Sequence, residues 1–499
     1  MARKESPQAK NPGRHQDAPD IFHISSEIYP FSKSGGLADV VGILPQALHD
    51  AGFRACVITP LYGRIATSQY RINLAYENCP VGYPWPDITT DIYRTDFHGI
   101  PIFFIDRGEY FDRKHYYCTH KGDYFDNCER FIFFCRAAVA LMERLGTQPR
   151  IVHAHDWHAA LCNTYIYFNK RSSAFWKETK TVFTIHNLAF QGRFSSRLFW
   201  DSGLPFEAWN MDGVEFFNSF NLLKAGIAYS DLITTVSPTY ASEILTPEFG
   251  CGMEGLLAKN KDKIWGILNG ADYSIWDPRK DRYLPRNYSL RDLSGKMECK
   301  KSLLQELCLP EKLADRPVFG FIGRMRRQKG IDLVLEAAQK LVEIGAGLIV
   351  LGEGKDLYET RLMELVEQHP KNIAGIVGYT EEMAHKIQAG ADVFLMPSRY
   401  EPCGLTQMYS LRYGTLPVAS AVGGLKDTIT PYPEKDANGF IFRKFGLEPF
   451  MQCLEQAVDI FRNQPLIWEK MRQRAMQTDF SWTKSAQVYA RAYESLAGD

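Results

Sequence analysis

An imidazole and a carboxylate, far apart in the sequence, each follow an apolar run that is typical of a β-strand. The first segment is Thr184-Ile185-His186-Asn187, and the second is residues 399–406, which contain Glu401. In open parallel α/β sheets, ligands bind outside the carboxyl ends of the strands. The two segments therefore predict two sheets that face each other across a cleft.

The segment with the carboxylate reads Arg-Tyr-Glu-Pro-Cys-Gly-Leu-Thr; it follows the apolar run 393–397 and opens a helical pattern. Amides at the start of a helix point at anions, and a carboxylate accepts hydrogen bonds from sugar hydroxyls. We therefore expect Glu401 to bind a sugar. An acidic residue there also complements the helix dipole, so a structural role stays open. The amides expected to contact phosphate are those of Gly404, Leu405 and Thr406.

Two cations follow the strand pattern 318–323. Arg324 comes directly after it, and Lys329 stands just before Gly330 and a helical pattern. Positive side chains at the carboxyl end of a strand neutralise a leaving diphosphate without a metal ion. Because Arg326 and Arg327 lie beside them, a solvated basic turn is the alternative.

A glycine turn links the strand pattern 21–25 to a helical pattern that reaches about residue 48. Its sequence is Lys33-Ser34-Gly35-Gly36-Leu37-Ala38-Asp39. Paired glycines let backbone amides approach an anion, while the helix N-terminus and Lys33 add positive charge. The turn is a candidate diphosphate site, and a glycine turn that serves packing alone is the alternative.

The segment His153-Ala154-His155-Asp156-Trp157-His158 suggests a metal, because an H-x-H pair on a strand places two imidazoles on one face. The sequence offers no convincing set of further ligands, and an aromatic ring beside a carboxylate suits carbohydrate binding equally well. The chain also has no D-x-D triplet, the usual metal-diphosphate handle of another large sugar-transfer fold. We therefore expect no metal and no cofactor.

These residues need parallel strands to position them, and the sequence predicts two sets. Short apolar runs alternate with helical patterns, as in a parallel sheet that helices cover on both faces. The fold class is therefore α/β, with two doubly wound parallel-sheet domains. The first set of strands is predicted at 21–25, 55–60, 100–106, 151–155, 181–186, 232–237 and 265–269. The second set is predicted at 318–323, 347–352, 373–378, 393–397 and 416–421, with a helix at 331–343.

The strand pattern restarts after Asn269-Gly270, which places the domain boundary there. We expect a disordered tail over residues 1–20, a first domain at 21–268 and a second domain at 269–478. A final helix within 479–499 would cap one of the domains, with the first as the candidate. The charged, proline-containing stretch 277–294 is expected at the surface near the junction.

Length and charge narrow the class of protein. The 499 residues exceed what one hydrophobic core usually supports. Lys plus Arg and Asp plus Glu both total 58, and this balance speaks against a nucleic-acid binder. Eleven scattered cysteines without a C-x-x-C pair fit reduced thiols. The first twenty residues lack the features of a signal peptide, and no apolar run is long enough to cross a membrane, so we expect a cytoplasmic protein.

Taken together, the segments resemble the family of bacterial glycogen synthases and plant starch synthases, which are retaining glucosyltransferases of GT-B architecture (glycosyltransferase family 5). The turn at 33–39 is similar to the family's K-[ST]-G-G-L-A-D signature. The resemblance covers about residues 21–496. The other similar segments, in family order, are 153–158, 184–187, 236–240, 268–270, 399–406, 423–425 and 479–482.

The resemblance implies transfer of glucose from a nucleotide diphosphate sugar to the non-reducing 4-hydroxyl of an α-1,4-glucan such as glycogen. Bacterial-type members imply ADP-glucose, and UDP-glucose stays open as a main or additional donor. Carried over by position, the catalytic residues are His186, Arg324, Lys329 and Glu401. The donor would contact Lys33, Gly35, Gly36, Asp39, Asn269, Tyr379, Gly404, Leu405 and Thr406, and the acceptor side would hold Glu27, Asp156 and Trp157.

Retention of configuration requires either a nucleophile on the opposite face of the sugar or attack from the face of departure. The sequence shows no separated carboxylate pair for the first route. We therefore expect same-face attack, in which the leaving phosphate oxygen helps to take the proton of the acceptor. Arg324 and Lys329 would supply most of the electrostatic stabilisation, and closure of the two domains would exclude water.

Two differences from related retaining transferases bear on the branch of the family and on the identity of the sugar donor. Those enzymes often have a second Glu eight positions after the first, where this chain has Tyr409, a feature of the glycogen and starch synthase branch. The loop 325–328, Met-Arg-Arg-Gln, is more basic than the family leads us to expect and leaves the donor base open. Two other functions remain as alternatives: an inactive glucan-binding protein, and a glucan phosphorylase, which would need a Lys bound to pyridoxal phosphate.

Overall fold

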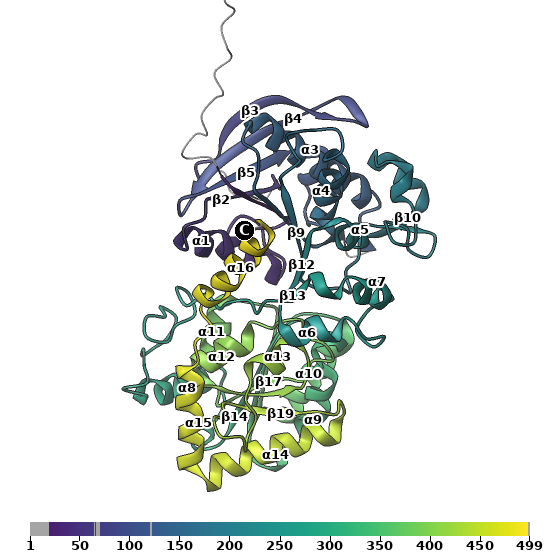
Figure 1. Cartoon of the computed structure of the whole chain (residues 1–499). Coiled ribbons are helices and arrows are strands. Elements are labelled where there is room, and N and C mark those ends of the chain that lie inside the picture. The colour runs from purple at the N-terminus through teal and green to yellow at the C-terminus, as the bar shows by residue number, and fades with distance from the viewer. Residues whose placement is uncertain (1–18, 64, 66–69, 120–121, 498–499) are drawn as a thin grey trace, which may run out of the picture. The chain divides into compact units, whose positions relative to one another are not determined.

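The computed structural model describes residues 19–63, 65, 70–119 and 122–497, and most of the predicted tail lies outside them (Figure 1). The chain divides into two compact units. The first unit takes in the described residues up to Thr184, the segment Phe190–Ile233 and the described residues from Tyr489 onward. The second unit consists of Ile185–Ala189 and Thr234–Val488.

A nine-stranded sheet contains most strands of the first unit, with the order β13-β12-β9-β8-β1-β2-β5-β4-β3. The edge strand β13 and the last residues of β9 and β12 fall within the residues assigned to the second unit. β1 pairs in parallel with β8 and with β2, so that Ile21 is opposite both Ile151 and Ala55. The strands are β1 (Ile21–Ile24), β2 (Ala55–Pro60), β3 (Asn73–Gly82), β4 (Trp85–Phe97), β5 (Ile100–Asp106), β8 (Ile151–His155), β9 (Lys180–Ile185), β12 (Leu232–Thr235) and β13 (Ile264–Gly266).

The edge of this sheet is antiparallel, which the sequence did not predict. β4 pairs antiparallel with both β5 and β3. Most side chains of β3 are exposed, so the strand carries no apolar run that would mark it in the sequence. The sheet is therefore mixed rather than purely parallel.

The long helix α3 of the first unit ends at a glycine. In α3, the backbone of Gly146 adopts φ 70°, and its N–H donates to the carbonyl of Glu143, which ends the helix. The helices are α1 (Gly36–Asp50), α2 (Gly108–Phe111), α3 (Asn127–Leu145), α4 (Asp156–Asn169) and α5 (Leu222–Tyr229). Two small antiparallel pairs accompany them, β6 (Cys118–Thr119) with β7 (Gly122–Asp123) and β10 (Arg193–Ser195) with β11 (Ser219–Asn221).

A six-stranded parallel sheet organises the second unit, with the order β16-β15-β14-β17-β18-β19. The short edge strand β19 was not predicted from the sequence, whereas the other strands fall where their apolar runs place them. The strands are β14 (Val318–Ile322), β15 (Gly347–Gly352), β16 (Ile373–Val377), β17 (Val393–Met396), β18 (Leu416–Ser420) and β19 (Phe440–Phe442).

Helices cover both faces of this sheet, as alternate residues of β15 show. Leu348 and Val350 pack into one buried cluster with apolar residues of α9 and α14, whereas Ile349 and Leu351 pack into another with residues of α8 and α11. The helices of this unit are α6 (Pro238–Glu243), α7 (Glu254–Lys259), α8 (Ser294–Glu306), α9 (Ile331–Glu343), α10 (Asp356–Gln368), α11 (Glu381–Gly390), α12 (Thr406–Arg412), α13 (Gly423–Thr428), α14 (Leu447–Asn463) and α15 (Pro465–Gln477). The last helix, α16 (Trp482–Ala497), begins in the second unit, and its residues from Tyr489 onward belong to the first.

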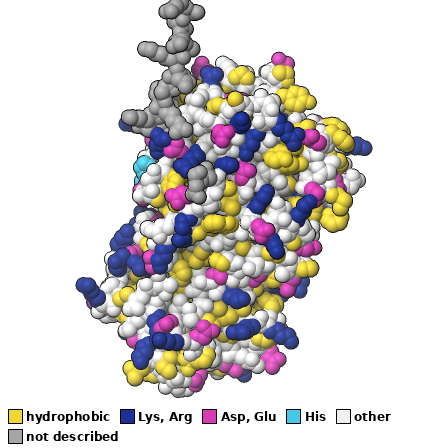
Figure 2. Space-filling model, in the orientation of Figure 1, with side chains coloured by type: hydrophobic (Ala, Val, Ile, Leu, Met, Phe, Trp, Pro, Cys, Tyr) yellow, Lys and Arg dark blue, Asp and Glu magenta, His cyan; other side chains and the backbone are white. Residues whose placement is uncertain are grey.

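The surface carries charges of both signs. Figure 2 shows one face, on which Lys and Arg side chains lie among Asp and Glu side chains. This mixture follows from the equal numbers of basic and acidic residues in the chain. Among the helices of the described residues, none has the length and apolar character needed to span a lipid bilayer.

Candidate active site

The strand order of the second unit changes direction between β14 and β17. From β14 the chain continues to β15 and β16 on one side, and from β17 it continues to β18 and β19 on the other. Such a point forms a crevice outside the carboxyl ends of the strands, where ligands of open α/β sheets bind. Arg324 follows β14 and Glu401 follows β17, so both predicted residues lie at this point.

Lys329 and Glu401 form an ion pair at the point where the strand order changes. The Nζ atom of Lys329 lies 2.5 Å from Oε2 of Glu401. The Glu401 side chain is only 7% exposed and that of Lys329 is 30% exposed. The hydroxyl of Ser398 also donates to Oε2 of Glu401, at 3.1 Å. A buried carboxylate thus has both a cation and a hydroxyl as partners, which the sequence alone did not reveal.

The loops that carry Lys329 and Glu401 are joined by close contacts and hydrogen bonds. Gly330 has φ 70°, and a Cβ at this position would lie 1.8 Å from the carbonyl oxygen of Pro397, so only glycine fits. The amide of Arg399 donates to the carbonyl of Gln328 at 2.8 Å, and the Arg399 guanidinium pairs with Asp332 at 2.7 Å. The loop after β14 therefore packs closely against the loop after β17.

A third loop, after β18, supports the backbone of Glu401. The amide of Gly424 donates to the Glu401 carbonyl at 3.2 Å. Gly423 has φ 43°, and a Cβ there would lie 2.0 Å from the same carbonyl oxygen. This close approach explains why two glycines begin α13.

The other predicted donor residues occupy the same edge of the sheet. Arg324 is exposed, while the next residue, Met325, is buried and donates its amide to the carbonyl of Glu353 at 2.7 Å. Tyr379 follows the edge strand β16 and is 57% exposed. β15 and β14 separate β16 from β17, so the strands that lead to Tyr379 and Glu401 are three strand spacings apart, about 14 Å.

Residues 404–406 surround the start of α12. Gly404 has φ 68°, and the helix begins at Thr406. The side-chain amide of Gln407 donates to the carbonyls of Cys403 at 3.0 Å and Gly404 at 2.9 Å. The first amides of a helix have no partners within it and are the donors that an anion would find here.

Asn269 and His186 lie next to the Glu401 loop within the second unit. Asn269 is 5% exposed, and its backbone N–H donates a hydrogen bond to the buried thiol sulfur of Cys403. His186 is half-buried, and burial lowers the pKa of its imidazole to about 3. The following residue, Asn187, hydrogen-bonds to the side chain of Tyr400, the neighbour of Glu401. The structure therefore brings His186 and Asn269 to the loop that carries Glu401.

The glycine turn of the first unit is held by Glu27. This carboxyl group is 2% exposed, and it accepts hydrogen bonds from the Ser34 amide, from the Ser34 hydroxyl at 2.6 Å and from the Tyr117 hydroxyl at 2.6 Å. Burial raises the pKa of Glu27, although these donors act in the opposite direction. Glu27, predicted on the acceptor side, therefore contacts the turn of the predicted diphosphate site. No sequence motif pointed to Tyr117.

Four further predicted residues belong to this turn and to the start of α1. The ammonium of Lys33 lies 2.6 Å from the carboxylate of Asp39 and 5.4 Å from the centre of the Tyr29 ring. Gly35 precedes α1, which begins at Gly36. Nothing lies within 4 Å of the position that a Cβ of Gly35 would take, so this glycine leaves the turn open to solvent.

Asp156 and Trp157 follow β8, next to β1, where the strand order of the first sheet changes direction. Asp156 has φ 55°, an uncommon conformation for a residue with a side chain. The Trp157 ring stacks on His158 at a centroid distance of 3.9 Å, and a Cβ on Gly192 would lie 2.4 Å from it. A glycine thus lets a second segment approach this ring.

Three buried imidazoles lie on β1 and β8. Ring nitrogens of His23, His153 and His155 lie within 4.8 Å of one another, and Nδ1 of His23 is 3.1 Å from Nε2 of His155. His153 has a hydroxyl at each ring nitrogen, Thr184 at 2.5 Å and Tyr493 at 2.7 Å. A metal ion would have to displace one of these hydroxyls, so the contacts fit a polar core better than a metal centre. Burial lowers the pKa of His23 to about 3.

Comparison with known proteins identifies the family. The model of the starch synthase catalytic domain matches residues 20–259, and the model of group 1 glycosyl transferases matches residues 310–454. The chain is 42% identical to a glycogen synthase of Anaeromyxobacter sp. (strain Fw109-5), over 96% of this chain and 99% of that one. It is 40% identical to a glycogen synthase of Haemophilus influenzae (strain ATCC 51907), over 95% and 100%. The chain belongs to the glycogen and starch synthase family of glycosyltransferases.

Solved structures agree with this family assignment. The catalytic domain of starch synthase IV from Arabidopsis thaliana, bound to ADP and acarbose, superposes with a TM-score of 0.89 at 30% identity, over 96% of this chain and 99% of that one. Sucrose-phosphate synthase from Thermosynechococcus elongatus, at 16% identity and a TM-score of 0.59, shares the fold alone. The predicted fold class, two α/β domains of the GT-B type, is confirmed. This family member is therefore a glycosyltransferase.

Proposed function

We propose that this glycosyltransferase transfers glucose from ADP-glucose to the non-reducing 4-hydroxyl of an α-1,4-glucan, with retention of configuration. The observation that carries the proposal is the ion pair between Lys329 and the buried carboxylate of Glu401 at the point where the strand order changes. This pair places a cation that can neutralise a diphosphate beside a carboxylate that can bind a sugar. Relatives named glycogen synthase over nearly the full length of the chain support the choice of polymer.

The donor would lie along the carboxyl edge of the second sheet. Arg324 and Lys329 would neutralise its diphosphate, together with the amides at the start of α12, and Lys33 would add a third positive charge. The exposed ring of Tyr379 follows a strand about 14 Å from the strand that leads to Glu401, a spacing that suits the base of a nucleotide whose sugar lies at Glu401. Asp39 and Asn269 complete the proposed donor contacts.

The ADP bound to the Arabidopsis starch synthase supports adenine as the base. UDP-glucose, the other donor considered from the sequence, has no comparable support among these relatives. The basic side chains of the loop 325–328 would act on the diphosphate, which both donors share, so they would not distinguish the donors.

The protonation state of His186 fits a role in holding the transferred glucose. Burial lowers its pKa to about 3, so the ring is neutral near pH 7. A neutral imidazole both donates and accepts a hydrogen bond, which suits a sugar hydroxyl. An imidazolium in the same place would compete with Arg324 and Lys329 for the diphosphate.

The partners of Glu401 favour an electrostatic role over a nucleophilic one. Its Oε2 is bound by Lys329 at 2.5 Å and Ser398 at 3.1 Å, and both contacts lower the nucleophilicity of the carboxylate. We therefore propose that the acceptor hydroxyl attacks from the face that the diphosphate leaves. The new C–O bond forms as the C–O bond to phosphate breaks, and the hydroxyl proton passes to the departing phosphate oxygen. Arg324 and Lys329 stabilise the charge that develops there.

The acceptor would meet the first unit at Asp156 and Trp157. A carboxylate and an indole ring at a strand end can bind successive glucose units, the ring by stacking and the carboxylate by accepting hydroxyl hydrogen bonds. The left-handed backbone of Asp156 is consistent with such a role, since strained residues concentrate at functional sites.

A comparison of donors tests the proposal. Glycogen is incubated with ADP-glucose or UDP-glucose, each labelled in the glucose, and the polymer is precipitated and counted. We expect label from ADP-glucose and little from UDP-glucose. Preferential use of UDP-glucose would overturn the proposed donor, and no labelling from either would overturn glucan synthesis. Glu401→Gln should abolish labelling, while Glu343→Gln, at a side chain 52% exposed, should not.

A further inference from the structure

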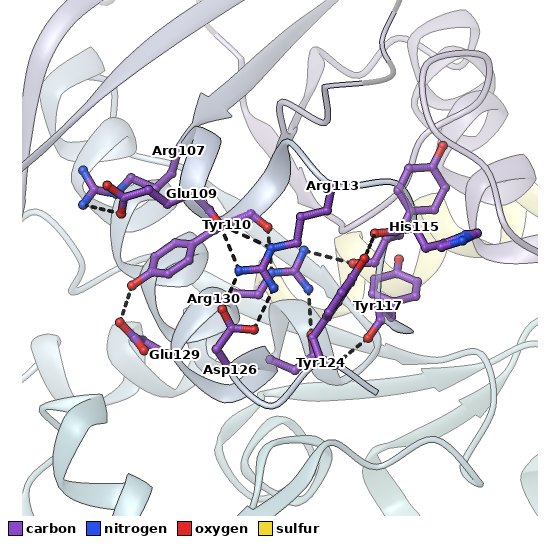
Figure 3. Close-up of polar contacts among 12 residues, drawn as sticks. Arg107, Glu109, Tyr110, Arg113, His115, Tyr117, Tyr124, Asp126, Glu129 and Arg130 are labelled. Carbon is purple, nitrogen blue, oxygen red and sulfur yellow. Dashed lines mark hydrogen bonds and ion pairs between the residues drawn. The ribbon is translucent and has the colours of Figure 1, made fainter. Parts of the chain in front are cut away.

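Arg130, in α3, is a buried cation in the first unit that no part of the proposed mechanism uses. It has 0% exposure, and its guanidinium donates hydrogen bonds in three directions (Figure 3). Nε donates to the carbonyl of Tyr110 at 2.8 Å, and another nitrogen donates to the carbonyl of Tyr116 at 2.9 Å. The remaining nitrogen donates to the side chain of Asn127 at 2.6 Å. One side chain thus binds α2, at Tyr110, and the loop between α2 and α3, at Tyr116. We call the loop between α2 and α3 the clamped loop.

Arg130 binds mainly backbone carbonyl groups rather than a carboxylate. The nearby carboxylate of Asp126 is engaged by Arg113 at 2.5 Å (Figure 3). The guanidinium of Arg130 instead lies 5.1 Å from the centre of the Tyr124 ring and 5.4 Å from that of Phe131. A buried guanidinium that donates hydrogen bonds to carbonyl groups constrains the backbone that carries them. A buried donor left without its acceptor would cost free energy of folding.

The clamped loop reaches the glycine turn through two tyrosines. The carbonyl of Tyr116 is bound by Arg130, and its hydroxyl accepts a hydrogen bond from the amide of Lys33 at 3.3 Å. The hydroxyl of the next residue, Tyr117, donates to Glu27 at 2.6 Å. Glu27 in turn accepts from the amide and hydroxyl of Ser34. A continuous series of hydrogen bonds therefore runs from Arg130 to residues 33–34.

We infer that Arg130, Tyr117 and Glu27 are positioning residues that set the conformation of the turn 33–36 for the donor diphosphate. This inference rests on the proposed function, in which Lys33 and the turn bind the donor. It also gives Glu27 a different role from the acceptor-side role predicted from the sequence. Each oxygen of this buried carboxylate is engaged by a donor on the turn or on the clamped loop, so neither is directed to an acceptor sugar without losing a partner.

Tyr117→Phe provides the most direct test. It removes the hydroxyl that binds Glu27 and keeps the ring that packs against His158 at a centroid distance of 4.5 Å. The same hydroxyl also hydrogen-bonds to the Ser26 hydroxyl at 2.8 Å. We expect the KM for ADP-glucose and the Kd for ADP to rise about tenfold, the effect of losing the hydrogen bond to the charged Glu27. The KM for the glucan primer should stay at its wild-type value. Ser34→Ala, which removes another donor to Glu27, should act in the same direction.

Tyr124→Phe is the matched control. Its hydroxyl lies in the same loop but donates to the carbonyl of His115 at 3.2 Å, with no bond to Glu27 (Figure 3). This variant should keep the wild-type KM for ADP-glucose, and its melting temperature shows what a lost tyrosine hydroxyl costs in this loop. A selective rise in the donor KM for Tyr117→Phe separates positioning from general loss of stability.

The outcomes separate this inference from the proposed function. Suppose that the wild type binds ADP and transfers glucose, and that the Tyr117→Phe and Ser34→Ala variants have the wild-type KM for ADP-glucose. The inference is then wrong, and the proposed function stands. A rise in primer KM without a change in ADP binding would assign Glu27 to the acceptor side after all. If the wild type neither transfers glucose nor binds ADP, the proposed function fails first, and the inference with it.

Discussion

Replacing Lys329 by Met should lower both the stability of the protein and its rate of transfer, and a second substitution, Glu401→Gln, should restore only the stability. The two charges lie 2.5 Å apart, and the Glu401 side chain is 7% exposed. At an effective dielectric constant near 20, their gross attraction is about 6.6 kcal/mol, much of which offsets the cost of burying the charges.

Removal of one partner leaves the other desolvated. In Lys329→Met, the buried carboxylate keeps the Ser398 hydroxyl but loses its cation, and we expect a loss of about 3 kcal/mol in the free energy of unfolding. The double variant has no uncompensated charge at this site, so about 2 kcal/mol should return. Urea unfolding of the wild type, both single variants and the double variant measures this difference.

The rate should not recover in the double variant. Lys329 is proposed to stabilise the departing diphosphate, and loss of one such group typically lowers kcat by about 10²–10³-fold. The exposed ion pair between Lys340 and Glu343, 3.4 Å apart, is the matched control. The equivalent cycle there should change stability by less than about 0.5 kcal/mol and leave kcat unchanged. Wild-type stability and rate in Lys329→Met, or a double variant with wild-type kcat, would refute the reasoning.

Three further outcomes follow from the same structure. Arg324→Ala should lower kcat by about 10²-fold or more with an unchanged melting temperature, since the side chain is exposed; steady-state kinetics and calorimetry check this. Gly330→Ala should destabilise by about 2–4 kcal/mol in urea unfolding, because its Cβ would meet the Pro397 carbonyl at 1.8 Å, and wild-type stability would contradict this. His23, neutral in the fold with a pKa of about 3, binds a proton near pH 6.5 only when unfolded. Stability is therefore lost as the pH falls from about 6.5 toward 3, and His23→Asn should lose about 2 kcal/mol less than the wild type between pH 7 and pH 5, as urea unfolding at both pH values would show.

Much of the scaffold could be predicted because parallel strands buried on both faces leave a clear signal. The strands β2, β5, β8 and β15 and the helix α9 have the bounds that their apolar patterns predict. The hairpin of β3 and β4 left no such signal, because only Cys79 and Val81 of β3 are buried and its sequence does not alternate clearly. Local sequence patterns indicate which side chains are buried. An edge strand with few buried side chains therefore leaves little pattern to detect.

The types of the site residues were visible in the sequence, but their contacts were not. Glu401 and Lys329 each stood at a strand end, yet nothing indicated that they pair or that Ser398 completes the site. Tyr117 lies in no motif and binds Glu27 only because the loop before α3 folds back on it. Such contacts join distant segments through tertiary packing, which no local pattern records.

The most direct test of the central claim follows the two products of a single reaction, ADP-glucose with a short maltooligosaccharide primer. The account predicts that each ADP released corresponds to one glucose added at the non-reducing end, and that NMR shows an α-1,4 linkage in the product. Release of ADP without growth of the primer, or a new β linkage, would contradict it.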